Sequence, residues 1–364
     1  MKQQMKQYDQ PDKTEAGRAE PAAGETAAKR QDPGCSAKAQ PGERASAAPE
    51  YDELVHLGSG IVNPSGNLAR SYSDMSMKAP GFTIMVSRAY NSTDARASLF
   101  STGWSFGFQS VLASFGNDAV IRMPDGSGRN FTLESGAYTA KDSRAKLTKS
   151  GSEYVLTTPD YYRYRYNAKG YMDLMTDPNG NEVNISVDAN GKVTAVTDAA
   201  GRTLTIDYAD NRICGVTESV TSRHVAYAYD ANGRLSQATA PDGGNTYYEY
   251  NAAGLLERVK DHDGAVLEEF TYEDLPNGGK IGIKTAKLPA GHTEVYDYDP
   301  GEKKVTSTAG NRTVTAWFDE ALYPVRIIDA EDGERRFSYN SVSDMPCCFA
   351  YWLSICFCDI ILEL

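Results

Sequence analysis

Residues 229–249 read YDANGRLSQATAPDGGNTYYE, and this stretch decides the fold because variants of it stand on both sides of it in the chain. Related segments begin at Tyr166 (YNAKGYMDLMTDPNGNEVNIS), Val187 (VDANGKVTAVTDAAGRTLTID) and Tyr250 (YNAAGLLERVKDHDGAVLEEFT). The first residues of the units, which we call lead residues, are 21 apart at Tyr166, Val187, Tyr208, Tyr229 and Tyr250. Tyr272 follows after 22 residues, and the register returns at Tyr298, Phe318 and Tyr339. A fixed period of this length indicates a tandem repeat of one supersecondary unit.

Each period contains two strands and two turns. Gly170, Gly191, Gly233 and Gly254 each follow an Asp or Asn by three residues, and another glycine stands ten residues after each of them. Between the glycines apolar side chains alternate with polar ones, as in Leu204-Thr-Ile-Asp-Tyr208. The alternation indicates strands with one buried face, and the Asx and Gly clusters indicate hairpin turns. The sequence therefore predicts an all-β fold of antiparallel hairpins that pair edge to edge in a twisted, curved sheet.

The Asp, Asn and Gly clusters have an alternative reading as calcium-binding loops. Asp188-Ala-Asn-Gly191 faintly resembles the start of an EF-hand loop, but it lacks the later acidic ligands and the flanking helices. We expect instead that these side chains cap their own turns. The histidines (His56, His224, His262 and His292) share no spacing and the cysteines lack a zinc pattern, so no metal or other cofactor is predicted.

The repeat, written Y-[DN]-x-x-G-x-[LMV]-x-x-[VAM]-x-[DP]-x-x-G, resembles the YD (Rhs) repeat of bacterial polymorphic toxins and of teneurins. The segment before it resembles the β-rich domain that precedes the repeats in Rhs-family proteins, although Ser65 and Ser101 depart from the family pattern. Residues 83–90 read as a strand, and Trp104 is expected to anchor a core, with ligand stacking as the alternative. The matching positions are Asn63, Gly66, Asp74, Arg88, Tyr90, Asn91, Gly103 and Trp104.

The resemblance implies a sheet that spirals into a hollow shell around a C-terminal toxin, with the preceding domain helping to plug one end. The lead tyrosines Tyr166, Tyr208, Tyr229 and Tyr250 would be inward anchors of that wall. About eight hairpins predict a partial shell and not a closed container. The implied partners are an effector domain and secretion machinery, and the implied location is secreted or cell-surface. No apolar stretch follows Met1, so a Sec signal is not expected and the chain would be cytoplasmic before another export route.

Four segments are predicted. Residues 1–50 are polar and low in complexity and are expected to be disordered; residues 51–160 form the β-rich domain, and residues 161–345 form the repeats. Residues 346–364 are apolar and hold four of the six cysteines. This tail is too short for a spanning helix. We interpret it as an out-of-frame or truncated end, with a capping strand or a membrane anchor as alternatives.

Composition and motifs limit the classes of function that the chain could have. A net charge of −12 argues against nucleic-acid binding. The recurring carboxylates Asp177, Asp198, Asp261 and Asp329 fall at turn positions, which indicates a structural role and not a paired acid and base, so an enzyme is not predicted. The leading hypothesis is a non-catalytic scaffold, a truncated part of a polymorphic-toxin shell. The alternative is an adhesion or carbohydrate-binding module, because tyrosine-rich sheets offer stacking surfaces.

Overall fold

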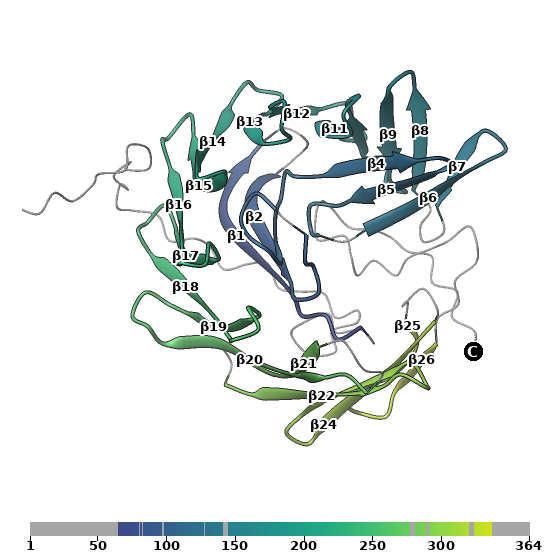
Figure 1. The fold of residues 1–364 in the computed structure, drawn as a ribbon, viewed down its shortest axis with the longest axis vertical. Helices are drawn as coiled ribbons and strands as arrows, with labels where there is room; N and C mark the ends of the chain where they lie inside the picture. The colour runs from purple at the N-terminus through teal and green to yellow at the C-terminus, as the bar shows by residue number, and fades with distance from the viewer. Residues whose placement is uncertain are drawn as a thin grey trace, which may run out of the picture. The chain divides into compact units, whose positions relative to one another are not determined.

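In the computed structural model, strands make up all of the regular structure of the described residues (Figure 1). The structure describes residues 65–79, 81, 83–96, 98–126, 128–140, 145–276, 281–288, 291–319 and 324–336. These residues form 26 strands and no helix. The all-β fold of tandem antiparallel hairpins, predicted from the 21-residue period, is confirmed.

The first three strands form a sheet of their own, which we call the small sheet. It consists of β1 (Ala69–Lys78), β2 (Thr83–Asn91) and β3 (Trp104–Phe106), antiparallel in the order β1-β2-β3. Strand β2 falls where the sequence predicts it. In the β1–β2 pair Tyr72 lies opposite Arg88, and a bulge between Ser73 and Met75 shifts the register. Such a bulge bends and twists a strand.

All later strands form the second sheet, which we call the long sheet, and each pairs antiparallel with the next. The strands before the predicted repeats are β4 (Val111–Phe115), β5 (Asp118–Arg122), β6 (Gly128–Glu134), β7 (Ala137–Ala140), β8 (Lys146–Ser150) and β9 (Glu153–Thr157). Those that follow are β10 (Arg163–Tyr166), β11 (Met172–Thr176), β12 (Glu182–Val187), β13 (Val193–Thr197), β14 (Thr203–Ala209), β15 (Arg212–Glu218), β16 (His224–Tyr229), β17 (Leu235–Thr239), β18 (Asn245–Tyr250), β19 (Leu256–Lys260), β20 (Val266–Asp274), β21 (Ile281–Lys287), β22 (Thr293–Asp299), β23 (Lys304–Ala309), β24 (Arg312–Phe318), β25 (Pro324–Ile328) and β26 (Glu334–Arg336).

Strand β4 pairs with β5 and also contacts the start of β11. Val111 forms a bridge with Tyr171, the Leu112 N–H donates to the Gly170 carbonyl over 2.7 Å, and the Met172 N–H donates to the Ser110 carbonyl over 3.1 Å. Strands β4–β11 therefore form a closed ring of neighbours. The strands from β12 onward continue from this ring as an open ribbon, because within the described residues β26 pairs only with β25.

A bulge recurs once in most repeats, at the lead residue. The register shifts between Ala228 and Tyr229, between Glu249 and Tyr250, and between Thr271 and Tyr272 where each of these strands meets the next. Bulges increase local twist and bend the bulged strand. A regular series of them accounts for the curvature of the sheet, which runs in an arc beside the small sheet in Figure 1.

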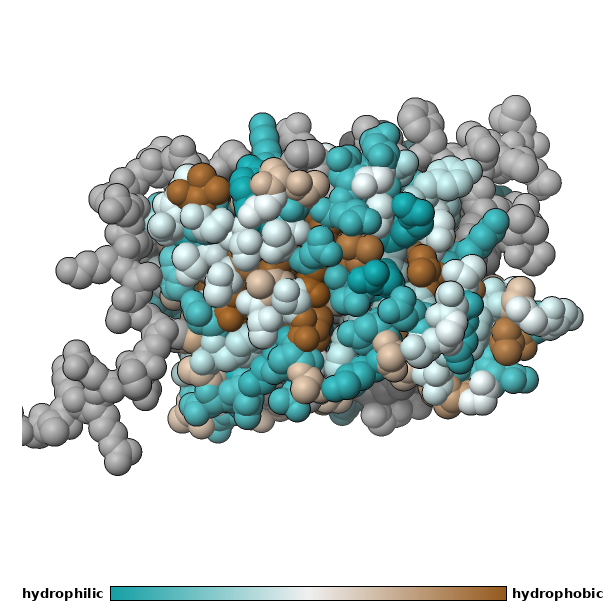
Figure 2. Space-filling model, turned by 90° about the horizontal axis from the view of Figure 1, so that it is seen from above, coloured by the Kyte–Doolittle hydropathy of each residue, from teal (hydrophilic) through white to brown (hydrophobic). Residues whose placement is uncertain are grey.

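One face of the long sheet is apolar. Side chains such as Val225, Tyr248 and Phe270 are buried and join one core with residues of the small sheet, Ile84 and Trp104 among them. On the surface that Figure 2 shows, hydrophilic side chains predominate and hydrophobic ones appear in small groups. This division follows from the two-residue alternation of side chains along a strand.

Several predictions fall outside the described residues: the disordered segment 1–50, the apolar tail 346–364, the motif residue Asn63 and the lead residue Tyr339. The boundary between residues 160 and 161 stays a prediction. Strand β9 pairs with β10 across it, with Tyr154 opposite Tyr166, so hydrogen bonding of the sheet is continuous there.

Candidate functional site

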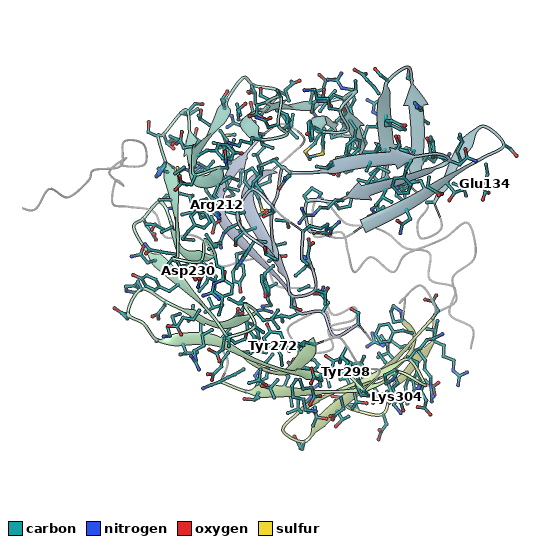
Figure 3. The ribbon with its side chains drawn as sticks, viewed as in Figure 1. Glu134, Arg212, Asp230, Tyr272, Tyr298 and Lys304 are labelled. Atoms are coloured by element: carbon teal, nitrogen blue, oxygen red, sulfur yellow. The ribbon has the colours of Figure 1, made fainter. Side chains whose placement is uncertain are left out.

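The turns of the repeat are closed by the Asp or Asn that follows the lead residue. The Asp230 N–H donates to the Arg234 carbonyl and the Gly233 N–H to the Asp230 carbonyl, both over 2.9 Å. Asp230 Oδ1 accepts the N–H groups of Asn232 and Arg234, both at 2.9 Å. Burial would raise the pKa of Asp230, but hydrogen bonds from Arg234 hold it below its usual value. The carboxylate, labelled in Figure 3, is thus engaged within its own turn.

The same arrangement recurs along the chain. Asp188 and Asn251 accept two backbone N–H groups each through Oδ1, which confirms the predicted turn capping. The glycines of these turns all have positive φ: Gly170, Gly191, Gly233 and Gly254, at 80°, 85°, 73° and 79°. That backbone conformation favours glycine. Within the described part of the chain, no group of three or more His, Cys, Asp or Glu could hold a metal ion.

Lead tyrosines fasten each hairpin to the strand before it. The hydroxyl of Tyr250 donates to the Leu235 carbonyl over 2.6 Å, and that of Tyr272 donates to the Leu256 carbonyl over 2.7 Å. Tyr208, Tyr229 and Tyr298 make the equivalent bond at 2.5–2.8 Å. Their rings are partly buried against the core, and Figure 3 labels two of them, Tyr272 and Tyr298. Tyr166 differs, because it is fully buried and its hydroxyl contacts Ser110 Oγ at 2.9 Å.

The small sheet meets the long sheet around an ion pair between Arg88 and Asp74. Arg88 Nε donates to Asp74 Oδ2, and Arg88 Nη2 donates to Asp74 Oδ1, both over 2.7 Å. The side chain of Arg88 is 2% exposed and that of Asp74 is 9% exposed. The two charges are therefore removed from water together, which is stabilising only where further polar partners surround them.

Two tyrosines of the long sheet supply those partners. The Tyr227 hydroxyl on β16 donates to Asp74 Oδ2 over 2.7 Å, and Arg88 Nη2 donates to the Tyr248 hydroxyl on β18 over 2.9 Å. These residues lie 153 and 160 positions from their partners in the sequence. The pair is thereby bound to two neighbouring hairpins of the long sheet.

Aromatic rings enclose the guanidinium of Arg88. Its carbon lies 5.4 Å from the ring centroid of Tyr72, 5.2 Å from Trp104, 5.5 Å from Tyr227 and 5.1 Å from Tyr248. A desolvated cation over such rings is stabilised by about 2 kcal/mol or more. Burial alone would lower the pKa of Arg88, but the nearby Asp74 and Tyr248 hold it well above its usual range. Arg88 therefore stays charged inside the core.

Trp104 and Tyr90 extend the contact. The Trp104 indole N–H donates to the hydroxyl of the lead tyrosine Tyr250 over 2.9 Å, and the Leu256 N–H donates to the Tyr90 hydroxyl over 2.9 Å. Trp104 is 0% exposed, so its ring faces protein on every side. Burial raises the pKa of Tyr90 to about 12. Gly103, beside Trp104, accepts the Asn91 N–H at 2.7 Å.

Further contacts near the start of the small sheet also bind it to the long sheet. Near its start the Gly66 carbonyl accepts the Ile283 N–H at 3.0 Å, and a Cβ at Gly66 would lie 2.5 Å from the Gly282 Cα. Only glycine allows this approach of two backbones. On β1, Arg70 forms an ion pair with Glu268, which also accepts the Tyr72 hydroxyl at 2.8 Å.

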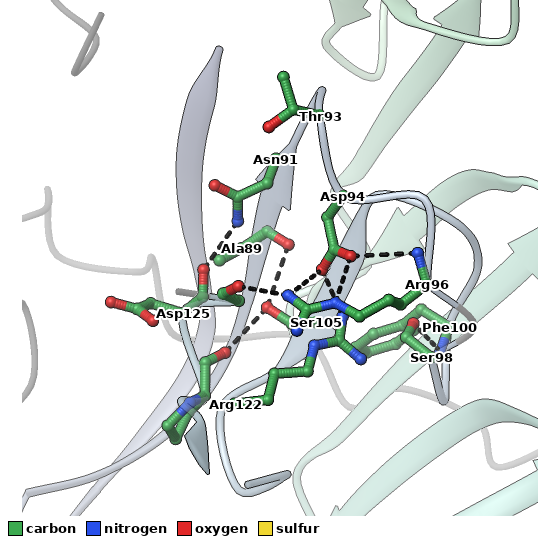
Figure 4. A network of polar contacts seen from close by, with 12 residues as sticks. Ala89, Asn91, Thr93, Asp94, Arg96, Ser98, Phe100, Ser105, Arg122 and Asp125 are labelled. Atoms are coloured by element: carbon green, nitrogen blue, oxygen red, sulfur yellow. Dashed lines mark hydrogen bonds and ion pairs between the residues drawn. The ribbon is translucent and has the colours of Figure 1, made fainter. Parts of the chain in front are cut away.

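A second polar network fixes the loop that follows β2. Asp94 binds Arg96 Nε at 2.7 Å and Arg122 Nη2 at 2.6 Å, while Asn91 Nδ2 donates to the Asp125 carbonyl over 2.7 Å (Figure 4). This network joins the small sheet to β5. It explains what Asn91 does, and it involves two arginines that sequence reasoning did not single out.

The structure thus brings together some predicted residues and adds others. Asp74, Arg88, Tyr90 and Trp104 converge in one buried contact, and Gly66 lies at its end. Sequence reasoning missed residues that complete it: Tyr72, Tyr227, Tyr248 and Glu268. A signal for two of them existed, because Tyr227 and Tyr248 each precede a lead tyrosine by two residues and so share its buried face. The described ranges contain no helix with the length and apolar character that a membrane crossing requires.

Two family models match the chain. A domain of unknown function, DUF6531, matches residues 60–131, and the RHS repeat matches residues 187–246 and 229–266. The first match covers the small sheet with the start of the long sheet. The second covers the hairpins that supply Tyr227 and Tyr248.

Curated relatives are much longer proteins. The chain is 34% identical over 327 residues to the probable deoxyribonuclease RhsB of Dickeya dadantii, covering 85% of the chain and 21% of that protein. It is 28% identical over 291 residues to the tRNA nuclease WapA of Bacillus subtilis, covering 78% of the chain and 12% of that protein. The chain therefore spans roughly an eighth to a fifth of the length of these relatives.

Among solved structures, the crystal structure titled TcdB2-TccC3-TEV aligns with 82% of the chain and 20% of its own, at 10% identity and a TM-score of 0.33. The family assignment rests on the repeat model and the sequence relatives. They agree with the 21-residue hairpin unit, with its capped turns and its lead tyrosines, and together they show that this chain is a member of the RHS/YD-repeat family.

Proposed function

We propose that this chain is a non-catalytic structural segment of a larger RHS-type toxin shell, which encloses or presents an effector. The observation that carries the proposal is the buried contact around Arg88 and Asp74. It fixes a small sheet against the apolar face of a long, open ribbon of hairpins. In such an arrangement the ribbon forms a wall, and the small sheet covers one part of its inner face. Further hairpins of a longer protein could pair with the edge of the ribbon.

The carboxylates at the repeat turns and in the buried contact are engaged in holding the fold. Asp177, Asp198 and Asp230 each accept two backbone N–H groups in their own turns. Asp74 is paired with Arg88 and Tyr227 inside the core. A general acid or base must instead reach a substrate. These contacts support a structural role.

Partners and location follow from the same proposal. A wall segment of this kind would act on an effector carried by the longer protein, and it would reach the cell exterior with that protein. The lead tyrosines, which suggested a carbohydrate-stacking surface, bind neighbouring carbonyls and pack against the core. They support a wall more strongly than an adhesion surface.

Two measurements test the proposal. The purified chain is incubated with tRNA and with double-stranded DNA in the presence of Mg²⁺, because relatives are named as nucleases. We expect both nucleic acids to stay intact, and cleavage by the chain alone would contradict a non-catalytic role. Sequencing of the locus should reveal a continuing repeat frame and an adjacent effector–immunity pair. A locus that holds neither would rule out the effector-shell role.

A further inference from the structure

The long sheet repeats the same hairpin, so its inner face offers the small sheet several similar places to bind. Most contacts do not distinguish one hairpin from the next. Trp104 binds the hydroxyl of lead residue Tyr250, but the lead residues one hairpin before and after, Tyr229 and Tyr272, are also tyrosines. The Tyr90 hydroxyl binds a backbone N–H, which every hairpin possesses. Some other feature must select the observed position.

The position two residues before the lead residue does vary, and we call it the inner position. Along the described repeats it is occupied by Tyr164, Ile185, Ile206, Tyr227, Tyr248, Phe270, Tyr296 and Ala316. All of these are buried, and all lie on the face toward the core. Within this series, two tyrosines stand in consecutive hairpins at one place, Tyr227 and Tyr248. That place is where Asp74 and Arg88 bind.

The two hydroxyls have different tasks. Asp74 requires a hydrogen-bond donor, which Tyr227 supplies at 2.7 Å. Arg88 requires an acceptor, which Tyr248 supplies at 2.9 Å. A tyrosine hydroxyl can perform either task, whereas isoleucine and phenylalanine can perform neither. The two hydrogen bonds of the ion pair to the long sheet therefore need two adjacent inner-position hydroxyls.

A shift of the small sheet by one hairpin in either direction breaks this match. Toward the C-terminus Asp74 would face Tyr248, but Arg88 would face Phe270 and lose its acceptor. Toward the N-terminus Arg88 would face Tyr227, but Asp74 would face Ile206 and lose its donor. A buried charge that loses a polar partner is strongly destabilised.

Glu268 adds to the discrimination in one direction. It lies four residues before the lead residue Tyr272 and binds Arg70 and Tyr72. The equivalent residue one hairpin later is Glu294, and one hairpin earlier it is Thr246. A shift toward the N-terminus would thus remove a carboxylate from Arg70 as well. A shift toward the C-terminus would be resisted by the hydroxyl pair together with the close approach of Gly66 to Gly282, where a Cβ at position 282 would lie 3.0 Å from the Gly66 Cα.

We propose that the Tyr227–Tyr248 pair is a recognition element that specifies where along the repeats the small sheet docks. Its partner is the Asp74–Arg88 pair of the same chain. Apolar contacts hold the small sheet on the ribbon, and the hydroxyl pair sets its register. This inference does not depend on the effector-shell function, because it concerns the position of one sheet on another.

Docking is measured first, through the fluorescence of Trp104 in full-length chain with Trp317 and Trp352 replaced by Phe. We expect Tyr227→Phe and Tyr248→Phe each to lower the docking equilibrium roughly 10- to 100-fold, the weight of a hydrogen bond to a charged group. Tyr247→Phe is the matched control. Tyr247 is adjacent on β18 but on the other face, and its hydroxyl has no hydrogen-bond partner within the described residues.

Position is measured next, because loss of stability alone would not show a role in register. A photo-crosslinking amino acid replaces Tyr72, whose ring lies 5.7 Å from that of Tyr248, and the joined peptides are identified by mass spectrometry. The parent should cross-link to β18. Variant Tyr227→Ile/Phe270→Tyr moves the tyrosine pair one hairpin onward, to positions 248 and 270. We expect the β18 cross-link to be lost. A β20 cross-link does not report a shift, because the Tyr72 hydroxyl already binds Glu268 on β20 in the parent.

Tyr164→Phe, an inner-position change outside the contact, should leave the β18 cross-link in place. Two results would overturn the proposal. One is docking in Tyr227→Phe and Tyr248→Phe as strong as in Tyr247→Phe. The other is a β18 cross-link of unchanged yield when the tyrosine pair has been moved.

Discussion

Replacing Arg88 with methionine tests whether the buried ion pair holds the small sheet in place. Methionine keeps the length of the apolar stem and removes the charge. Asp74 then keeps one polar contact in the core, the Tyr227 hydroxyl at 2.7 Å, and loses the two contacts of 2.7 Å to the guanidinium. Removing one partner of a buried pair costs about 3–5 kcal/mol, because the other charge stays buried without compensation.

A matched substitution on the surface calibrates this cost. Arg258 also forms ion pairs, with Glu249, Glu257 and Glu269, but its side chain is 35% exposed. Exposed ion pairs contribute about 0–1 kcal/mol. Arg258→Met should therefore lower the free energy of unfolding far less than Arg88→Met does, although each substitution removes one positive charge.

The double variant Arg88→Met/Asp74→Leu separates the pair from its surroundings. It removes both charges of the pair from the core, although the hydroxyls of Tyr227 and Tyr248 lose their partners. We expect the double variant to cost less than the sum of the single variants, with an interaction energy of about 2–3 kcal/mol. Additive costs would indicate that Asp74 and Arg88 act independently of each other.

The assay is urea unfolding at 25 °C, followed by two signals. Emission of Trp104, with Trp317 and Trp352 replaced by Phe, reports the contact, because Trp104 lies 5.2 Å from the Arg88 guanidinium. Far-ultraviolet circular dichroism reports the long sheet. In Arg88→Met the fluorescence transition should move to lower urea and precede the dichroism transition. A midpoint for Arg88→Met equal to that for Arg258→Met would refute the reasoning.

Three further changes are expected to have smaller effects, each measured by urea unfolding of the full chain. Tyr161 has a φ of 66°, is 72% exposed, and makes the turn hydrogen bond that Gly180 makes elsewhere. Tyr161→Gly should relieve ~1–2 kcal/mol of left-handed backbone strain, while Gly adds ~0.5–1 kcal/mol of entropy to the unfolded chain. The net effect should be a stabilisation of about 0.5–1 kcal/mol. A loss of stability would contradict this. Tyr229→Phe should destabilise by about 1 kcal/mol, because one hydrogen bond is lost; a change within error would show that its hydroxyl bond adds nothing. Burial lowers the pKa of His224 below its usual 6.5, with Asp207 opposing, so the folded state binds fewer protons than the unfolded chain and stability falls as the pH drops below about 6.5. Between pH 7.5 and 5.5 the free energy of unfolding should fall less in His224→Gln than in the parent. An equal fall would show that His224 does not cause this pH dependence.

The periodic part of this structure could be predicted from the sequence because it is set locally. Alternation of apolar residues, as at Leu204 and Ile206, defines a strand and its buried face. An Asx residue three positions before Gly233 or Gly254 defines a hairpin turn. Neither feature requires knowledge of distant residues, so the class of fold and the unit of repetition followed directly.

The contact between the two sheets could not be predicted in the same way. Asp74 and Arg88 were found as motif positions through a family resemblance, which gives no partner for either. Tyr227 and Tyr248 lie more than 150 residues away in the sequence, and no local pattern joins the two pairs. The return of β4 to Tyr171 is unpredicted for the same reason, because a single bridge leaves no periodic trace.

Departures from the period are therefore where specific properties of a repeat protein should be sought. The repeating features are shared by every hairpin, so they can build a wall but cannot mark a place on it. Adjacent hydroxyls at Tyr227 and Tyr248 are a departure, and they bind the buried Asp74–Arg88 pair of the small sheet. Tyr161 is another, since it replaces a turn glycine at a cost in strain and its ring is exposed. In a chain of near-identical hairpins, a partner can recognise one particular hairpin only through residues that differ from the repeat, because the repeating residues are the same in every hairpin.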